Sequence, residues 1–419
     1  MFTRIHKLNQ LPSNVSAFLG VNANNTTKNV RSIFRYSFAI KNNEHISVNT
    51  AQQQVLKKYQ RPFSICRNNY VSIAARATGS KDESKDFLAV FPEIVHELTD
   101  AANSLETRQA AEWFTKALEY NVPRGKLNRG ILAVSTYKQA AKAEQQTPEN
   151  LKLAHYLGWC IEMLQSFFLL TDDVMDGSTT RRGQLCWYKL ENVGLIALND
   201  ALMIENGMYV LFHKHFRHLD CYVDLLDLFH QITFITTMGQ SLDILNSNKT
   251  VSEFNIDVYN SIVANKSSFY TFYLPVAAAL HLAGVTDREV FANCRAIILE
   301  MGNFFQIQDD FLDCFGDPEV TGKVGTDIQD NKCSWLAVKC MEQANPEQRA
   351  IMEECYGQND PEKVARVKQL YEELDLASYY AKFQEDKFNQ IKTQIEQAHK
   401  GVPKAILLQA LQKLHQRQS

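Results

Sequence analysis

Two short acidic clusters, both of the form D-D-x-x-D, place the strongest constraint on how this chain folds. They span residues 172–176 and 309–313, and each follows an apolar stretch that contains a pair of phenylalanines. Carboxylates are costly to bury unless a partner compensates their charge. On a helix, the first and last aspartates of each cluster lie four residues apart on one face, where like charges repel. The pattern therefore predicts two helices whose acidic turns meet a positively charged partner.

The chemistry of the clusters indicates that this partner is a magnesium ion. Mg²⁺ takes one or two carboxylates from a segment and completes its shell with water and substrate phosphates. Two such clusters on facing helices would hold several Mg²⁺ around one diphosphate. The alternative is two solvated acidic helix turns, which fits poorly with the apolar residues 167–170 and 304–307 that lead into them.

Charge is distributed unevenly along the 419 residues. Residues 1–80 contain eleven Lys and Arg against one acid, Glu44, which gives +10 and leaves −13 on the remainder, since the whole chain carries −3. The body has no basic stripe with interleaved aromatics, which argues against nucleic acid. The nine cysteines are scattered without a C-x-x-C pair, which is typical of reduced thiols and offers no zinc site. The longest uncharged run, residues 267–286, contains Pro275 and small polar residues, and indicates a buried helix instead of a membrane span.

Residues 1–77 differ from the rest of the chain. They are rich in Asn, Ser, Thr and Arg, nearly free of acid, and mix basic with apolar residues at helix-compatible spacing. This composition predicts a mitochondrial transit peptide. The alternative is a disordered tail without a targeting signal, in which case a cytoplasmic location is expected.

From residue 78 to residue 419 we expect a single all-α domain, a bundle of antiparallel helices around a central cavity. Apolar residues recur at i, i+3 and i+4, and Gly and Pro separate the periodic stretches. The expected helical segments are 86–104, 105–120, 131–144, 151–175, 193–216, 222–245, 253–268, 268–283, 287–314, 333–343, 346–355, 360–376, 377–400 and 402–416. Both aspartate clusters then lie near the C-terminal ends of core helices.

Diphosphate chemistry needs cations besides the metals, and two segments near the first cluster offer them. Lys126 and Arg129 lie in a glycine-flanked loop, residues 125–130, where glycines allow close approach to a ligand. Such a loop is otherwise a plain connection between helices. Arg181 and Arg182 directly follow the cluster and form either a surface ion-pair network or bidentate grips on phosphate.

Further polar candidates surround the second cluster and the helix before it. Lys323 and Lys332 flank a Gly-containing segment, residues 325–330, that would close over a substrate; each lysine is otherwise simply solvated. Gln240 and Asp243 share one face of a helix, three residues apart.

An aromatic-rich stretch follows Lys266 and Ser267. We interpret Phe269 and Phe272 as core residues. Tyr270 and the Lys266 carbonyl are candidates for stabilising a cationic intermediate, because a π-face or a carbonyl dipole attracts positive charge.

These motifs resemble those of the farnesyl diphosphate synthases, which are short-chain trans-isoprenyl diphosphate synthases. The first match is FFLLTDDVMD, residues 167–176, with TRRGQ at residues 180–184. The second is FFQIQDDFLDCFGDP, residues 304–318, which continues through GKVGTDIQDNKCSW at residues 322–335. The similarity runs from about residue 86 to the C-terminus, and residues 1–77 lie outside it.

The resemblance implies an all-α, Mg²⁺-dependent prenyltransferase that acts on small diphosphates, most often as a homodimer. It would condense isopentenyl diphosphate with dimethylallyl and then geranyl diphosphate to give farnesyl diphosphate. Three Mg²⁺ per active site would be held by Asp172, Asp176 and Asp309, with Asp173, Asp310 and Asp313 in support.

The resemblance also implies roles for the remaining polar residues. The allylic diphosphate would be gripped by Arg181, Lys266 and Lys323, and isopentenyl diphosphate by Lys126, Arg129, Gln165 and Arg182. Gln240, Asp243 and Gln306 match the inner lining, and Ser267 and Lys332 join the substrate-binding set. Phe167 and Phe168 would form the floor that limits product length, since they lie about one helical turn before Asp172.

Three departures from the family pattern leave alternatives open. The C-terminal tail has only Arg417 near its end, Thr237 stands where an acid is expected, and Ser267 replaces the usual Thr. A terpene synthase derived from this family would release a hydrocarbon or alcohol and would shed the grips on isopentenyl diphosphate, but these residues are present. A catalytically silent partner subunit would show eroded aspartate clusters, and both clusters are intact.

Overall fold

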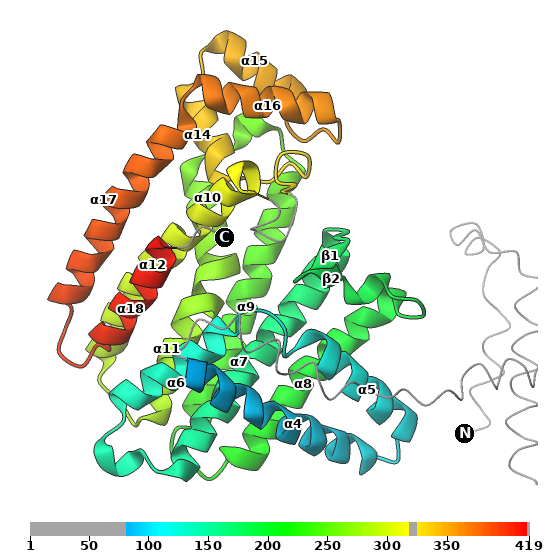
Figure 1. Ribbon diagram of the computed structural model, residues 1–419, viewed down its shortest axis with the longest axis vertical. Helices are drawn as coiled ribbons and strands as arrows, with labels where there is room; N and C mark the ends of the chain where they lie inside the picture. The colour runs from blue at the N-terminus through cyan, green and yellow to red at the C-terminus, as the bar shows by residue number, and fades with distance from the viewer. Residues whose placement is uncertain (1–80, 318–324, 417–419) are drawn as a thin grey trace, which may run out of the picture. The chain divides into compact units, whose positions relative to one another are not determined.

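The computed structural model describes residues 81–317 and 325–416 (Figure 1). The leader expected at residues 1–77, the side chain of Lys323 and the tail residue Arg417 lie outside these residues, so the predictions made for them stay predictions. The helices of the described part are α4 (Lys81–Asn103), α5 (Arg108–Asn121), α6 (Asn128–Ala140), α7 (Pro148–Met175), α8 (Ala197–His215), α9 (Tyr222–Ser247), α10 (Ile256–Ile262), α11 (Leu274–Leu282), α12 (Arg288–Phe315), α14 (Trp335–Gln343), α15 (Pro346–Cys355), α16 (Pro361–Glu373), α17 (Leu376–Gln397) and α18 (Lys404–His415). The all-α prediction is confirmed.

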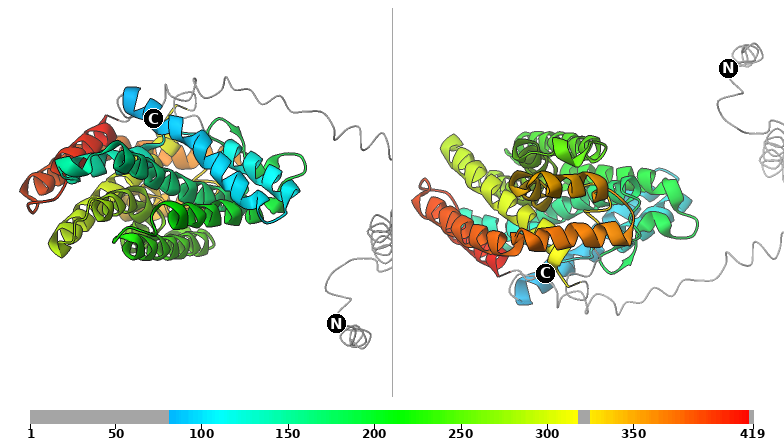
Figure 2. Two further views of the ribbon diagram at one scale, coloured as in Figure 1. Left: turned by 90° about the horizontal axis from the view of Figure 1, so that it is seen from below. Right: turned by 90° about the horizontal axis from the view of Figure 1, so that it is seen from above.

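The helices form two groups around a central set. Helices α4, α5 and α6 lie at one end of the described unit, and α14, α15 and α16 lie at the other (Figure 1). The first group lies in front in the view from below, and the second lies in front in the view from above (Figure 2). In both views α17 and α18 lie along one side. Between the two groups, α7 packs on α6 and α8, while a π-helical segment packs on α9 and α12.

The apolar core of the described residues has three large clusters. The first is built chiefly from α4 to α9, the second from α10 and α14 to α16, and the third from α12, α17 and α18. The π-helical segment contributes Phe269 to the first cluster, Val263 to the second and Phe272 to the third. The interpretation of Phe269 and Phe272 as core is therefore confirmed, and this segment joins the parts of the bundle.

Helix boundaries place both aspartate clusters as the sequence predicts. Helix α7 begins after Thr147, whose side chain accepts from Asn150 N–H, and has Pro148 at its first position. Helix α12 begins after Asp287, which caps it in the same way. Both clusters lie at the C-terminal ends of these helices: residues 172–175 form the last turn of α7 with Asp176 as its C-cap, and residues 309–313 lie near the end of α12.

The expected boundary at residue 268 is absent. Helix α10 continues through the π-helix Val263–Tyr273 (η8) into α11 without interruption. A π-helix has more residues per turn than an α-helix, so the apolar stripe changes phase there and imitates a boundary in the sequence. Such π-segments often occur at functional sites.

Two glycines allow neighbouring helices to approach η8 closely. A Cβ at Gly239 of α9 would lie 2.2 Å from the backbone nitrogen of Lys266. A Cβ at Gly302 of α12 would lie 2.1 Å from Ser268 Oγ. Real Cβ atoms do not approach other atoms this closely, so the sandwich of α9, η8 and α12 depends on glycine at both positions.

A short hairpin, which the sequence analysis did not predict, follows α7. Strand β1 (Thr180–Arg181) pairs antiparallel with β2 (Gln184–Leu185) through Arg182 and Gly183, which both have positive φ. Positive φ at both central residues defines the tight turn that suits hairpins. Strands of two residues are too short to show the alternation of apolar and polar residues by which a strand is predicted from a sequence.

The segment that follows the hairpin is fixed by a buried carboxylate. Asp200 of α8 accepts hydrogen bonds from the indoles of Trp113 and Trp187, each at 2.8 Å. Trp187 comes directly after the hairpin, so Asp200 holds this segment against α5 and α8.

Two helical stretches of the described residues are long and apolar enough to cross a membrane. They are Pro148–Met175, whose apolar window is 72% buried, and Gly194–His215, whose window is 44% buried. The first is a core helix of the bundle. The second stretch carries exposed large apolar side chains, among them Leu195, Leu202 and Val210.

Replacing Gly239 by Ala tests the close packing of α9 on η8. Ala is favoured over Gly in a helix by about 1 kcal/mol, but overpacking against backbone costs about 1–3 kcal/mol or more. We therefore expect Gly239→Ala to lower the free energy of unfolding, measured by urea denaturation. Ser241→Ala, an exposed position on the same helix, is the control and should be neutral. An unchanged or raised stability for Gly239→Ala would refute the close approach.

Candidate active site

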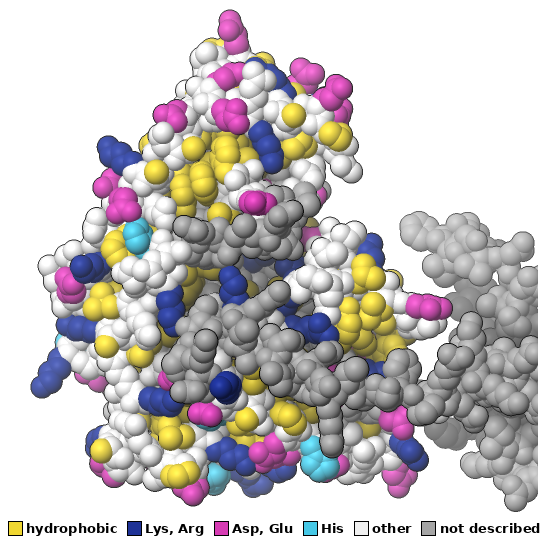
Figure 3. Space-filling model, in the orientation of Figure 1, with side chains coloured by type: hydrophobic (Ala, Val, Ile, Leu, Met, Phe, Trp, Pro, Cys, Tyr) yellow, Lys and Arg dark blue, Asp and Glu magenta, His cyan; other side chains and the backbone are white. Residues whose placement is uncertain are grey.

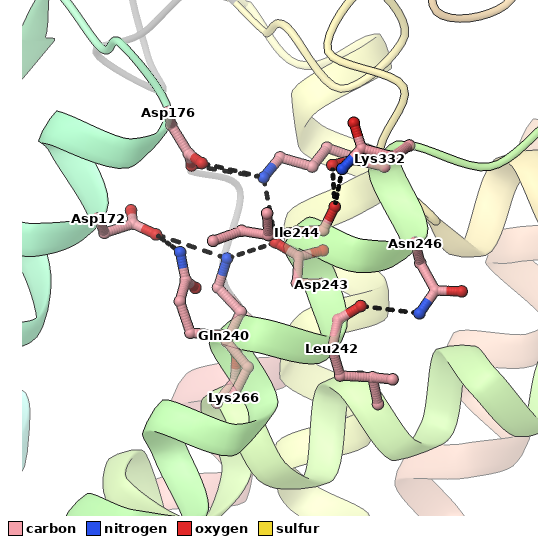
Figure 4. Close-up of polar contacts among 12 residues, drawn as sticks. Asp172, Asp176, Gln240, Leu242, Asp243, Ile244, Asn246, Lys266 and Lys332 are labelled. Carbon is pink, nitrogen blue, oxygen red and sulfur yellow. Dashed lines mark hydrogen bonds and ion pairs between the residues drawn. The ribbon is translucent and has the colours of Figure 1, made fainter. Parts of the chain in front are cut away.

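Asp172, the first aspartate of the first cluster, is surrounded by donors from three other segments. Its Oδ1 accepts from Gln240 Nε2 of α9 at 3.1 Å and lies 3.5 Å from Lys266 Nζ of η8 (Figure 4). Its Oδ2 accepts from Arg181 of the hairpin at 3.1 Å. The positive partner that the sequence requires is therefore provided in part by the protein itself.

Asp173, the next residue, anchors the hairpin. It is buried, and its Oδ1 accepts from Arg181 Nε at 2.8 Å. Burial raises the pKa of Asp173 above its ordinary value, although the Arg181 guanidinium acts against this. Arg181 thus bridges Asp172 and Asp173, so the hairpin arginine forms an ion-pair network with the first cluster.

Asp176 meets a lysine that is distant in the sequence. Lys332, just before α14, lies 3.3 Å from Asp176 Oδ1 and 3.0 Å from Asp243 Oδ2. Burial and the neighbouring Asp172 raise the pKa of Asp176. Asp243 also accepts from Lys266 Nζ at 2.7 Å. The structure therefore brings Lys266 and Lys332 together beside the first cluster.

The aspartates of the second cluster make different contacts. Asp310 is buried, and it accepts from Gln306 Nε2 and from the backbone N–H of Trp335, each at 2.9 Å. Burial raises its pKa to about 7, against the donors that favour the ionised form. Asp313 accepts from the backbone N–H of Asp327 at 3.0 Å. Both residues fasten the segment between α12 and α14 to the end of α12, while Asp309 is half-buried on that helix.

The π-helical segment connects the two clusters. Lys266 reaches Asp172 of the first cluster, and the next residue, Ser267, donates to Gln306 Oε1 at 3.0 Å. Gln306 in turn donates to Asp310 of the second cluster. The serine that replaces the usual threonine therefore still makes a hydrogen bond within the site.

A second part of the site contains two arginines whose guanidinium groups form no salt bridge, although the buried Glu162 interacts electrostatically with both. Arg129 at the start of α6 donates to Gln165 Oε1 at 3.0 Å, to Thr271 Oγ1 at 2.7 Å and to the Tyr270 hydroxyl at 3.1 Å. Its guanidinium also lies over the Tyr270 ring, 4.7 Å from the centroid. These partners are all neutral.

Arg182 is the second such arginine. It donates to the backbone carbonyl of Asn121 at 3.0 Å, and burial lowers its pKa to about 10, so it stays charged at neutral pH. A Cβ at Gly125 would lie 2.9 Å from Arg182 Nε, which places the glycine-flanked loop against this side chain. The buried Glu162 carboxylate acts through space against the lowering of the Arg182 pKa and also interacts with Arg129, although neither guanidinium forms a salt bridge within the part of the chain that is described. Lys126 is exposed in the same loop.

Two phenylalanines of α7 lie below the first cluster. Phe167 and Phe168 are half-buried with ring centroids 5.2 Å apart. Phe168 meets the Tyr270 ring edge-on at 5.3 Å. The position about one turn before Asp172 agrees with the sequence prediction.

Sequence reasoning missed several residues that complete the site. Thr271 and the Asn121 carbonyl hold the two arginines, and the buried Glu162 accepts from the backbone N–H of Gly130 at 2.8 Å. Glu162 and Thr271 lie in apolar stretches of the sequence. Spacing alone does not distinguish them from polar residues that are satisfied within a core.

The donor set fits Mg²⁺ held jointly with a substrate. Among residues 81–317 and 325–416, no three His, Cys, Asp or Glu side chains converge on a ready-made metal site. Mg²⁺ does not need one, because it usually binds through one or two carboxylates and completes its shell with water and phosphate oxygens. Asp172 and Asp176 supply two carboxylates from one helix face, as Figure 4 shows. The surrounding Arg181, Lys266 and Lys332 would match a diphosphate.

The arrangement suits a reaction of two anionic substrates. Cations paired with carboxylates form one part, and two guanidinium groups that donate to neutral groups form the other. In the view of Figure 3, Lys and Arg side chains occur across the middle of the face, while Asp and Glu lie mostly toward the edges. This fold and this site define an all-α synthase of the isoprenoid type.

Comparisons with known proteins agree with this class. The sequence pattern of the polyprenyl synthetase family matches residues 111–374. Farnesyl pyrophosphate synthase of Rattus norvegicus is 48% identical over 339 residues, which cover 80% of this chain and 96% of the rat protein. The enzyme of Gallus gallus is 46% identical over 340 residues, 80% of this chain and 93% of its own. The chain therefore belongs to the polyprenyl synthetase family, among the farnesyl pyrophosphate synthases.

A solved structure supports the same assignment. T. brucei farnesyl diphosphate synthase complexed with risedronate superposes with a TM-score of 0.76 and 32% sequence identity. The match covers 80% of this chain and all of that chain.

Proposed function

We propose that this protein condenses isopentenyl diphosphate with dimethylallyl diphosphate and then with geranyl diphosphate, and releases farnesyl diphosphate. The observation that carries the proposal is the division of the site. Arg181, Lys266 and Lys332 lie among the aspartates, where a metal-bound diphosphate would fit. The guanidinium groups of Arg129 and Arg182 instead donate to neutral groups, and the buried Glu162 acts on both only through space. Two diphosphates can thus be bound side by side without competing for the same cations.

The first part of the site favours ionisation of the allylic substrate. When bound at Asp172, Asp176 and Asp309, Mg²⁺ would supply Lewis-acid stabilisation of the diphosphate charge. Arg181, Lys266 and Lys332 donate hydrogen bonds to the diphosphate oxygens as the C–O bond breaks and the electron pair leaves with the diphosphate. Lys323, which the family resemblance adds to this set, stays a prediction.

The second part holds the nucleophile. Arg129 and Arg182, with Lys126 and Gln165, bind the diphosphate of isopentenyl diphosphate and direct its double bond at the allylic cation. Loss of a proton to the released diphosphate completes each condensation. Tyr270 contacts both Arg129 and Phe168, and its ring would face the cationic intermediate.

The product assay tests this function. With the full chain, Mg²⁺, isopentenyl diphosphate and geranyl diphosphate, we expect farnesol to be extractable only after phosphatase treatment. A hydrocarbon or alcohol released without phosphatase would identify a terpene synthase instead. Asp172→Ala should abolish turnover, and a near-normal rate in that variant would refute the assignment of the first cluster.

We propose in addition that Phe167 and Phe168 limit product length. The edge-on contact of Phe168 with Tyr270 supports this role, because Tyr270 also contacts Arg129 of the proposed substrate site. We expect Phe168→Ala to lengthen the products beyond fifteen carbons, measured by chromatography after dephosphorylation. Phe388→Ala, which removes a ring that stacks on His415, is the control. Unchanged product length in Phe168→Ala would remove the floor role.

We propose that the protein is a homodimer formed through α8 and α9. Most of the exposed large apolar side chains of the described residues lie on or beside these helices: Leu195, Ile196, Leu198, Leu202, Val210, Val223, Phe234, Met238 and Leu245. Apolar surface on this scale commonly marks an interface, and two-fold dimers are the commonest closed assembly.

Sedimentation velocity tests the dimer. The full chain should sediment as a species with twice the mass of one chain. Leu202→Glu should sediment as a monomer, because dimerisation would bury a charge in the interface. Leu105→Glu, at an exposed position on another surface, is the control and should leave the dimer intact. A monomeric full chain would contradict the proposal. The mitochondrial address remains a prediction from the leader's composition.

A further inference from the structure

Helix α9 presents two polar side chains to the site, three residues apart. Gln240 donates to Asp172, whereas Asp243 accepts from two lysines that come from different segments (Figure 4). Lys266 lies on η8, and Lys332 lies on the segment just before α14. Asp243 is thus the point where α9, η8 and the approach to α14 meet.

Both ammonium groups bind the same oxygen atom of Asp243. Oδ2 lies 2.7 Å from Lys266 Nζ and 3.0 Å from Lys332 Nζ. The two nitrogens therefore lie no farther apart than the sum of these distances, although two positive charges repel each other. The carboxylate between them offsets this repulsion, and its loss would let the ammonium groups separate.

Each lysine extends from this shared point toward a different aspartate of the first cluster. Lys266 Nζ lies 3.5 Å from Asp172 Oδ1, and Lys332 Nζ lies 3.3 Å from Asp176 Oδ1. The two grips thus take up positions one helical turn apart along α7. Asp243 fixes the spacing between them.

Asp243 itself is withdrawn from solvent. Only 6% of the residue is exposed. Burial acts to raise the pKa of Asp243, but the two lysines outweigh it and hold the pKa below its ordinary value, which keeps the carboxylate ionised at neutral pH. The charge of Asp243 therefore acts mainly on the two lysine ammonium groups that donate to it.

The backbones that carry the lysines have other anchors. Ser267, next to Lys266, donates to Gln306 at 3.0 Å. The Lys332 carbonyl accepts from the Tyr356 hydroxyl at 2.7 Å, and Trp335 N–H donates to Asp310. Removing the charge of Asp243 should consequently move the ammonium groups and leave the helices in place.

We infer that Asp243 is a positioning residue: through one carboxylate oxygen it holds Lys266 and Lys332 together as a paired grip on the departing diphosphate. The inference rests on the proposed prenyl transfer. It assigns Asp243 a role through the lysines and not through direct binding of metal or substrate. The paired grip acts as the leaving group gains charge, so its loss affects kcat more than the binding of isopentenyl diphosphate.

Asp243→Asn is the first test, because Asn keeps the shape and removes the charge. We expect kcat to fall on the order of 10²-fold, as for the loss of a preorganised charge partner. The KM for isopentenyl diphosphate, the melting temperature and the Mg²⁺ concentration for half-maximal rate should stay near those of the unmodified chain. Asp243→Glu keeps the charge and should recover part of kcat. Asp227→Asn, an exposed position on the same helix, is the matched control for charge removal.

A double-mutant cycle with Lys332→Met separates positioning from a direct role. If Asp243 acts through the lysines, Asp243→Asn should cost much less in the Lys332→Met background than alone, because contacting residues couple. Additive losses, or a raised Mg²⁺ requirement in Asp243→Asn, would overturn the inference and make Asp243 a direct ligand.

A binding measurement distinguishes failure of this inference from failure of the proposed function. Calorimetry with inorganic diphosphate and Mg²⁺ reports the paired grip without any turnover. We expect weaker binding to Asp243→Asn and unchanged binding to Asp227→Asn. Equal binding to all three proteins would overturn the positioning role even if elongation is observed. Absence of elongation by the unmodified chain would refute the proposed function alone.

Discussion

Compensation of the aspartates on α7 by cations from distant segments is the interaction on which the site depends. Asp172 and Asp173 share Arg181 of the hairpin, while Lys266 and Lys332 arrive from η8 and from the approach to α14. Uncompensated carboxylates in an apolar bundle would be strongly destabilising. The need for these partners therefore ties three separate parts of the chain to the end of one helix.

The bundle meets this requirement through close packing around η8. Gly239 and Gly302 let α9 and α12 approach the π-helix, and this contact brings Lys266 to Asp172 and Ser267 to Gln306. The same segment contributes to all three large apolar clusters. Core packing and charge placement are thus set by the same residues, which explains how a helical scaffold can hold so many charged groups at fixed distances.

The sequence predicted the helices and both aspartate clusters because helix periodicity and short motifs are local signals. It also selected Arg129, Arg181 and Lys332 from their positions along the chain, and the family resemblance added the side chain of Lys266. It did not reveal that Arg129 is held by Thr271, that Asp243 bridges two lysines, or that α10 and α11 form one continuous helix. These features depend on which segments meet in space, and a π-helix disrupts the very periodicity that is used to find helices.

A crystal structure with Mg²⁺ and a bisphosphonate would show how the aspartates on α7 and the two lysines share a diphosphate. We expect metal ions to bind oxygens of Asp172 and Asp176, and Lys266 and Lys332 to contact the bisphosphonate while both remain hydrogen-bonded to Asp243. Arg129 and Arg182 should stay available for a second anion. Metal bound directly to Asp243, or lysines drawn apart from it, would contradict the positioning role of Asp243.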